Sequence, residues 1–221
     1  MNKLQASLGT ALCTVFLIAG CSNKSDKSDD TPSKGNTEAA KKSSDPVDTP
    51  IADKSASSAD EAISEAKKGA KSLGKTLKRR LVGAMQEGGP ESALSACAQD
   101  AQSLSAGVQT PRLRVGRSTL RLRNPKNAES PAWVQEWLTT TGERKTEGLS
   151  GLEEVVDGVA RVIVPLTASG MCLGCHGDAA SHTDKMKQLL ASKYPEDKAV
   201  GYENGDLRGV IWAEYDLAAK K

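Results

Sequence analysis

One pentapeptide, Cys172-Leu173-Gly174-Cys175-His176, limits what this chain can be more than any other feature. Two cysteines separated by two residues and followed at once by a histidine form the attachment sequence of c-type haem. Each thiol can add to one vinyl group of the porphyrin, and the adjacent His176 is directed at the iron as an axial ligand. The sequence therefore predicts one covalently attached haem c, bound by Cys172, Cys175 and His176, with His176 as a metal ligand.

Two other interpretations of this motif stay open on the residues alone. A dithiol redox motif usually begins a helix after a βα unit, and we find no such unit before Cys172. A zinc site would need further ligands, which His182 or Cys97 could supply. Export from the cytoplasm favours haem, because c-type attachment takes place outside that compartment.

The first residues of the chain predict such export. Lys3 gives a short basic start, residues 11–18 are apolar, and small residues lead to Cys21. The apolar stretch is too short to span a bilayer, so we expect residues 1–20 to be removed as a signal peptide. Cys21 lies where a lipoprotein signal peptidase needs it, although an ordinary secretory signal with an incidental cysteine is the alternative. We predict lipidation at Cys21, tethering to a membrane, and a periplasm-facing or surface location, with Ser22 favouring the outer membrane.

Composition then divides the rest of the chain. Residues 21–56 are rich in Ser, Asp, Lys, Thr and Pro, which predicts a lipidated, disordered stalk. Residues 57–221 are enough for one domain. With 30 basic and 28 acidic residues the net charge is only +2, so we expect no nucleic-acid partner.

The apolar pattern of that domain predicts helices first and a mostly antiparallel sheet afterwards. Apolar residues recur at three- and four-residue intervals from Ile63 to Met85, and Gly88-Gly89 ends this helix. A second helix follows from Pro90, with Cys97 on its inner face.

The remaining elements follow from alternation and turn residues. Strands are expected around residues 113–115 and 120–122, with Gly116 as a bulge or turn between them. Asp157-Gly158 predicts a hairpin of strands 152–156 and 159–166. We also expect a short helix after Pro131, another before Pro195, and a closing strand over residues 209–217. The fold class is therefore α+β.

The second axial ligand of the iron is open on these residues. The candidates are Cys97, His182, Met85, Met171 and Met186. His182 and Met171 lie close in sequence to His176, so neither reaches the opposite face of the haem easily. Cys97 comes from a distant helix, and its alternative role is that of a small core hydrophobe.

Arginines are concentrated before the predicted turn at residues 124–127. The five are Arg112, Arg114, Arg117, Arg121 and Arg123. Most are expected on a solvated strand face. A guanidinium also matches the carboxylate of a haem propionate, and we predict this cofactor-binding role for Arg117 and Arg123.

Several segments taken together match a known family. They are ALSAC at 93–97, VGRS and RNPKN within 115–127, CLGCHG at 172–177, and YPEDKA, GY and GDLRG within 194–209. On these segments the chain resembles the single-haem, PAS-like domain family, long filed under a domain of unknown function. The resemblance covers nearly all of residues 58–217. It implies a PAS-like antiparallel sheet with long N-terminal helices around a c-type haem pocket, and it implies that Cys97 is the metal ligand opposite His176.

Two functions follow for such a protein. The first is a redox or small-ligand sensing module that passes its signal to a separate partner protein. The alternative is a periplasmic or surface cytochrome that transfers electrons. An enzyme such as a peroxidase would need distal acid–base groups, and with two histidines in the chain, one of them proximal, we expect no enzymatic activity.

Overall fold

The computed structural model describes residues 54–219. The predicted signal peptide, the lipidation site at Cys21 and nearly all of the predicted stalk lie outside the described residues. Among the residues that are described, none of the helices combines the length and the apolar character needed to traverse a bilayer.

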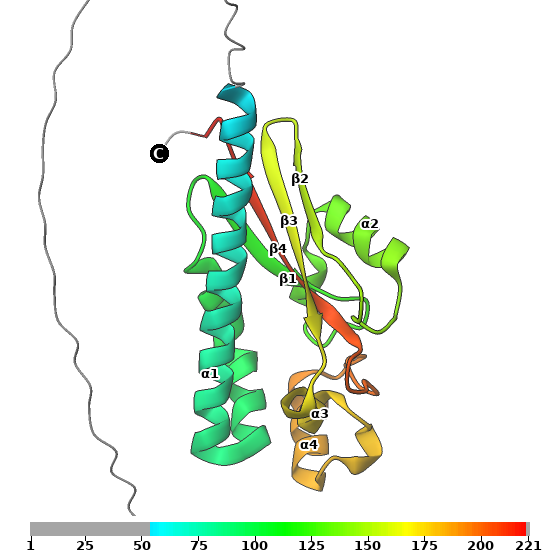
Figure 1. Cartoon of the computed structure of the whole chain (residues 1–221). Coiled ribbons are helices and arrows are strands. Elements are labelled where there is room, and N and C mark those ends of the chain that lie inside the picture. Colours follow the sequence, from blue (N-terminus) through cyan, green and yellow to red (C-terminus); the bar gives the residue numbers. More distant parts are fainter. Residues whose placement is uncertain (1–53, 220–221) are drawn as a thin grey trace, which may run out of the picture. The chain divides into compact units, whose positions relative to one another are not determined.

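The first element, α1 (Lys54–Ala106), consists of two helical arms joined at a sharp turn. The turn lies at Gly88 and Gly89, where Gly89 has a φ of 69° that a side chain would disfavour. Pro90 follows and begins the second arm, as predicted. Figure 1 shows that this second arm runs back beside the first. Alanines let the arms approach closely, with Ala84 of the first arm packed against Ala93 and Ala96 of the second.

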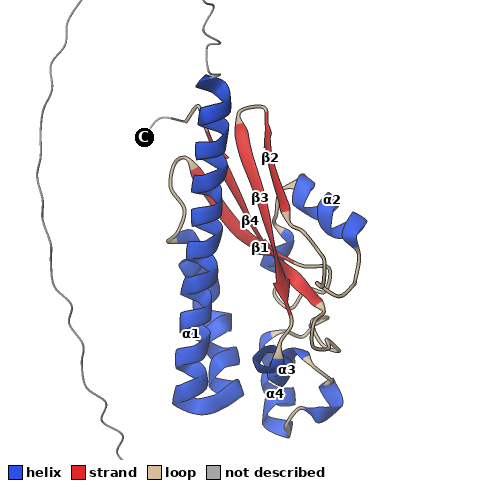
Figure 2. Cartoon of the chain, in the orientation of Figure 1, coloured by secondary structure: helices blue, strands red, loops and turns tan. Residues whose placement is uncertain are grey.

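Four antiparallel strands form one sheet in the order β1-β4-β3-β2 (Figure 2). Their bounds are β1 (Leu113–Ser118), β2 (Leu152–Val156), β3 (Val159–Thr167) and β4 (Leu207–Asp216). The predicted hairpin of β2 and β3 is confirmed, and both turn residues have positive φ, 51° at Asp157 and 75° at Gly158. This geometry is the two-residue turn that matches strand twist.

Helices cover both faces of the sheet. The first arm of α1 covers one face with mostly small side chains, so helix and sheet approach closely. The other face packs against α2 (Ala132–Thr141), which begins after Pro131 as predicted and buries Val134 and Leu138 against Ile163, Val210 and Trp212. The remaining short elements are η1 (Pro125–Ala128), α3 (Gly170–His176), η2 (Ala179–Ser181) and α4 (Asp184–Lys193).

Two local predictions were wrong. Gly116 is neither a bulge nor a turn, because β1 continues through it in regular register opposite Trp212. A Cβ atom at residue 116 would lie 2.4 Å from Cζ2 of the indole, so the glycine makes room for a cross-strand aromatic ring. Residues 120–122, which alternate like a strand, form no strand. The α+β class, with its long N-terminal helix and PAS-like antiparallel sheet, is confirmed.

Candidate functional site

A cavity of about 340 Å³ lies where both arms of α1, the end of the sheet and α3 meet. This volume falls within the range of about 300 to 1,000 Å³ that is usual for small-molecule sites. Most of the wall is aliphatic, and its larger apolar side chains are Leu77, Leu81, Leu94, Leu104, Leu166 and Ile211. The site therefore suits a ligand with a large apolar body.

Helix α3 brings the predicted attachment residues to this cavity. Cys172, Cys175 and His176 all line it, and both cysteines are free thiols of intermediate burial. The Cys175 sulfur lies 3.9 Å from the carbonyl oxygen of Pro90, at the turn between the arms of α1. The sequence did not predict α3 as a helix, because its seven residues, about two turns, are too few to show an apolar period.

The imidazole of His176 is oriented by a hydrogen bond from its Nδ1 to the carbonyl oxygen of Ala199, at 2.7 Å. Because a carbonyl only accepts, Nδ1 carries the proton and Nε2 keeps its lone pair. Burial lowers the pKa of His176 well below the usual 6.5, and the charges of Arg208 and Arg123 lower it further. A neutral imidazole with a free Nε2 is the form that binds metals, with its second nitrogen held by a backbone carbonyl.

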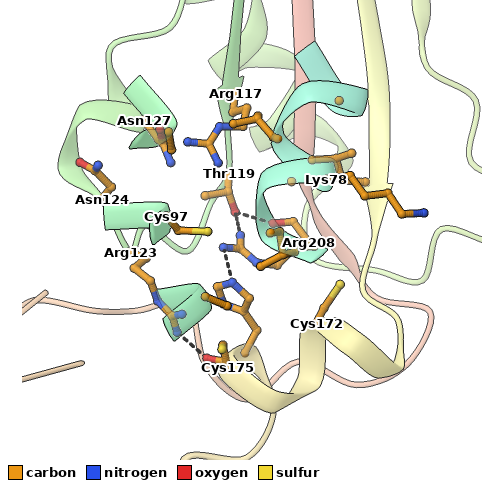
Figure 3. A pocket seen from close by; sticks show the side chains of 18 of the residues that line it. Lys78, Cys97, Arg117, Thr119, Arg123, Asn124, Asn127, Cys172, Cys175 and Arg208 are labelled. Atoms are coloured by element: carbon orange, nitrogen blue, oxygen red, sulfur yellow. Dashed lines mark hydrogen bonds between the residues drawn. The ribbon is translucent and has the colours of Figure 1, made fainter. Parts of the chain in front are cut away.

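Cys97 reaches the same cavity from the second arm of α1. Figure 3 shows it on a different element from Cys172 and Cys175 but facing the same space. Burial raises the pKa of the Cys97 thiol, while the positive charges of Arg117, Arg123 and Arg80 act in the opposite direction. The predicted inward orientation of Cys97 is confirmed.

The other candidates for a second ligand are placed differently. Met85 and Met171 line the cavity, and Met171 is 42% exposed. Met186 is buried against Leu94, Leu190 and Tyr194, and neither it nor His182 is among the residues that line the cavity. Within residues 54–219 we find no cluster of three or more His, Cys, Asp or Glu side chains arranged to hold a metal, so the zinc alternative gains no support.

The two arginines predicted to bind a cofactor both line the cavity but differ in their partners. Arg123 is 8% exposed and pairs with Asp197 at 2.9 Å. It also donates to the carbonyl oxygens of Cys175 at 2.6 Å and Ala199 at 3.2 Å. Its guanidinium therefore holds the segments that carry and orient His176.

The side chain of Arg117 makes no hydrogen bond or ion pair with any residue of the described part of the chain. Burial lowers its pKa, and the nearby Cys97 and Tyr194 act in the opposite direction. Its partly buried charge therefore lies near Cys97 without a carboxylate partner. The remaining arginines of the group, Arg112, Arg114 and Arg121, do not line the cavity and bond to other parts of the protein.

Sequence reasoning missed Arg208, at the start of β4. Its Nη2 lies 3.3 Å from Nε2 of His176, and its Nη1 lies 3.4 Å from the Thr119 hydroxyl (Figure 3). Its guanidinium also lies over the ring of Tyr202, 5.1 Å from the centroid. The available signal was an arginine directly before the apolar closing strand, but only the folded sheet shows that it meets the histidine.

The charges around the cavity are all of one sign. The cationic side chains that line it are Lys78, Arg80, Arg117, Arg123 and Arg208, and the described lining contains no aspartate or glutamate. Arg80 is paired with Asp100 and Arg123 with Asp197. Arg117 and Arg208 are left as partly buried cations without a carboxylate partner. A ligand that fits this site has acidic groups on an apolar body.

The chain is similar to proteins already described. A family model described as "Tll0287-like: Tll0287" matches residues 45–214, which is most of the chain. Among solved structures, the crystal structure of the cyanobacterial heme-protein Tll0287 matches with 20% sequence identity and a TM-score of 0.49. That match covers 67% of this chain and 93% of the other. No curated protein matches the chain.

Proposed function

The chain belongs to the Tll0287-like family, and from that premise we propose that it is a membrane-tethered protein with one haem c, covalently attached to Cys172 and Cys175. The protein for which the family is named is described as a cyanobacterial haem protein. The observation that carries the proposal is that the two cysteines and Nε2 of His176 lie at one apolar cavity.

The residues of the cavity fit this cofactor. Aliphatic side chains suit the porphyrin ring, and the partly buried cations Arg117 and Arg208 suit its two propionates. The Nε–H of Arg208 is buried without a hydrogen-bond partner among the described residues, as expected of a side chain whose acceptor is a ligand. Arg123 is better suited to positioning, because its guanidinium is bonded to Asp197, Cys175 and Ala199.

Each protein ligand has a distinct task in this proposal. His176 presents Nε2, and the carbonyl of Ala199 keeps the proton on the other nitrogen. We propose Cys97 as the second axial ligand, because its thiol lines the cavity from the opposing helix. The charge of Arg117 favours the thiolate form of Cys97 that iron requires.

We propose redox or small-ligand sensing as the role. Bound haem supplies an iron centre that accepts or releases one electron and can exchange an axial ligand. Burial raises the pKa of the free Cys97 thiol, so its binding to iron would have to offset the release of this proton, and a weakly held ligand would be suited to displacement by a signal molecule. The signal would pass to a separate partner protein.

The alternative function is that of an electron-transfer cytochrome. The observation that favours it is the exposure of Met171. This residue is 42% exposed, and it borders the cavity beside Cys172. An exposed edge at the attachment helix would bring an electron partner close to the cofactor. We propose no enzymatic role, because the described lining of the cavity holds no histidine besides His176 and no carboxylate that could act as a distal acid or base.

The cellular setting belongs to the same proposal. A lipid on Cys21 would tether the protein to the outer membrane, facing the periplasm or exposed on the surface, with no part for nucleic acid. Lipidation is testable by mass spectrometry of the N-terminal peptide from a membrane fraction, with Cys21→Ser as the control.

Mass spectrometry of denatured protein tests the haem directly. Material made with a haem-attachment system should retain the added mass of one haem, and a pyridine haemochrome spectrum should identify its thioether form. Cys172→Ala together with Cys175→Ala should lose that mass, whereas Cys97→Ala should keep it. A wild-type chain without the added mass would refute covalent attachment.

Ligand binding and potentiometry distinguish the two roles. A sensor should bind carbon monoxide or nitric oxide with loss of the Cys97 ligand, and the gas-bound wild type and gas-bound Cys97→Ala should then have the same spectrum. A carrier should bind neither gas and should exchange electrons rapidly with a partner cytochrome.

A further inference from the structure

Arg208 lies against the one atom of His176 that a metal would bind. Its Nη2 is 3.3 Å from Nε2, and Nε2 is the acceptor of this contact because Nδ1 donates to Ala199. A neutral imidazole has one lone pair on Nε2, and it points along one direction in the plane of the ring. Nε2 therefore cannot accept a hydrogen bond from Arg208 and bind iron at the same time.

Arg208 has no carboxylate among its other contacts. The hydroxyl of Thr119 is 3.4 Å from Nη1, the ring face of Tyr202 lies beneath the guanidinium, and the buried Nε–H has no acceptor among the described residues. Burial lowers the pKa of Arg208, and the charges of Arg123 and Arg117 lower it further. Arg123, whose side chain is 8% exposed, has Asp197 as a carboxylate partner. A partly buried guanidinium near other cations and without an anion is costly, so Arg208 is suited to a carboxylate that arrives from outside the chain.

We propose that Arg208 binds a carboxylate of the porphyrin. When the cofactor enters the cavity, the guanidinium leaves Nε2 of His176 and pairs with this carboxylate instead. The proposal rests on the proposed haem function and adds a residue to it. In the chain without cofactor, Arg208 occupies Nε2 and keeps the imidazole neutral and oriented. In the loaded protein, Arg208 would be paired with the carboxylate, and the Nε2 lone pair of His176 would be available to bind the metal.

This exchange needs little movement of the backbone. Arg208 stands at the start of β4, which is paired with both β1 and β3, so its Cα is held by the sheet while the long side chain turns. The Thr119 hydroxyl also accepts from the backbone N–H of Arg121 and donates to the carbonyl oxygen of Arg208, which ties this part of the site together.

Metal-free protoporphyrin IX tests the carboxylate contact separately from iron. The full chain, made without a haem-attachment system, is titrated with protoporphyrin IX and with its dimethyl ester, and binding is followed by porphyrin fluorescence. We expect Arg208→Gln to weaken binding of the diacid by at least about tenfold, the effect of one charge-assisted hydrogen bond, and to leave binding of the ester unchanged. Arg208→Lys should retain part of the diacid affinity.

Arg79→Gln is the matched control, because it removes the same charge from an exposed position of α1 that does not line the cavity. It should bind the diacid as the wild type does. Circular dichroism establishes that each variant is folded, and Arg208→Lys provides the comparison if Arg208→Gln is not.

Two results would overturn the inference. One is an equal loss for diacid and ester in Arg208→Gln, which would mean a change of shape and no carboxylate contact. The other is that Arg208→Gln binds the diacid as tightly as the wild type does, or that the wild type itself does not bind the diacid. Covalent attachment is read independently by mass spectrometry, so a chain that binds the diacid through Arg208 but never acquires haem mass would refute attachment and leave this inference intact.

Discussion

Arg123 and Asp197 form a buried ion pair, with Nη2 of the arginine 2.9 Å from Oδ2 of the aspartate and the side chains only 8% and 10% exposed. The pair joins the segment after β1 to the segment after α4. The same guanidinium donates to the carbonyl oxygen of Cys175, within the attachment motif. Arg123 therefore holds the backbone on either side of His176 in place without contacting the imidazole ring.

Removing Arg123 should destabilise the protein strongly. Arg123→Ala leaves the Asp197 carboxylate buried without its partner, and such changes reduce the free energy of unfolding by about 3 to 5 kcal/mol. Urea unfolding of the chain without cofactor, followed by circular dichroism, measures this loss. Lys67→Ala is the control, because its ion pair with Glu153 is about half exposed on both sides and should contribute less than about 1 kcal/mol. Equal losses in the two variants would contradict the structural role of Arg123.

Gly116 should tolerate no side chain, because of its position opposite Trp212. In Gly116→Ala the new methyl group would lie 2.4 Å from the indole, so strand β1 or the ring has to shift. We expect a loss of about 1 to 3 kcal/mol in the free energy of unfolding, as for other overpacked cores. Gly83→Ala is the matched control, since a Cβ at this helical position meets no atom within 4 Å. Replacement of a helical glycine should add about 0.5 to 1 kcal/mol of stability, so the two thermal midpoints should move in opposite directions.

The elements that the sequence predicts well are those determined by neighbouring residues. The turn at Asp157-Gly158 requires two positive φ angles, and the Gly88-Gly89 break and Pro90 start of α1 are equally local. The prediction for Gly116 was wrong because a glycine is needed there to make room for the indole of Trp212, which is about a hundred residues away in the chain. Local alternation gives no information on which ring stands across a strand.

The residues of the candidate site also fall into two groups, those that the sequence predicts and those that only the folded structure brings together. Cys172, Cys175 and His176 are adjacent in sequence, so their shared chemistry can be predicted from their spacing. Arg208 touches His176 only because β4 begins beside α3. Asp197 pairs with Arg123, and Ala199 accepts from His176, only because the chain returns to the cavity after α4. These contacts depend on tertiary structure, which no local pattern encodes.

The stability of the chain without cofactor should decrease in mild acid. Burial lowers the pKa of His176 in the folded state below the ordinary value near 6.5, so the unfolded chain takes up this proton first as the pH falls. The stabilising contribution is therefore complete above pH about 6.5 and is lost as the pH falls from there toward the folded pKa. The slope from this group reaches at most about 1.4 kcal/mol per pH unit.

Urea unfolding between pH 7 and pH 5 measures this decrease, in a range above the ordinary pKa values of carboxyl groups. His176→Asn should lower the slope, because asparagine does not titrate. His182→Asn should retain most of it, since the pKa of His182 is lowered too but less markedly. A slope that is unchanged in His176→Asn would show that other groups cause the acid sensitivity.

The last prediction concerns the proposed bond between Cys97 and iron. Cys97→Ala removes the sulfur but keeps the helix and a small apolar side chain, so the cavity and both cysteines of the motif should be preserved. Haem mass should remain, while the spin state and the Soret band should change because the iron would lose its thiolate ligand. Met85→Leu is the control on the same cavity wall, and it should leave the spectrum as in the wild type. If Cys97→Ala had an unaltered spectrum while Met85→Leu changed it, the second ligand would be the methionine of the first arm of α1, and Cys97 would be a buried core residue beside Arg117.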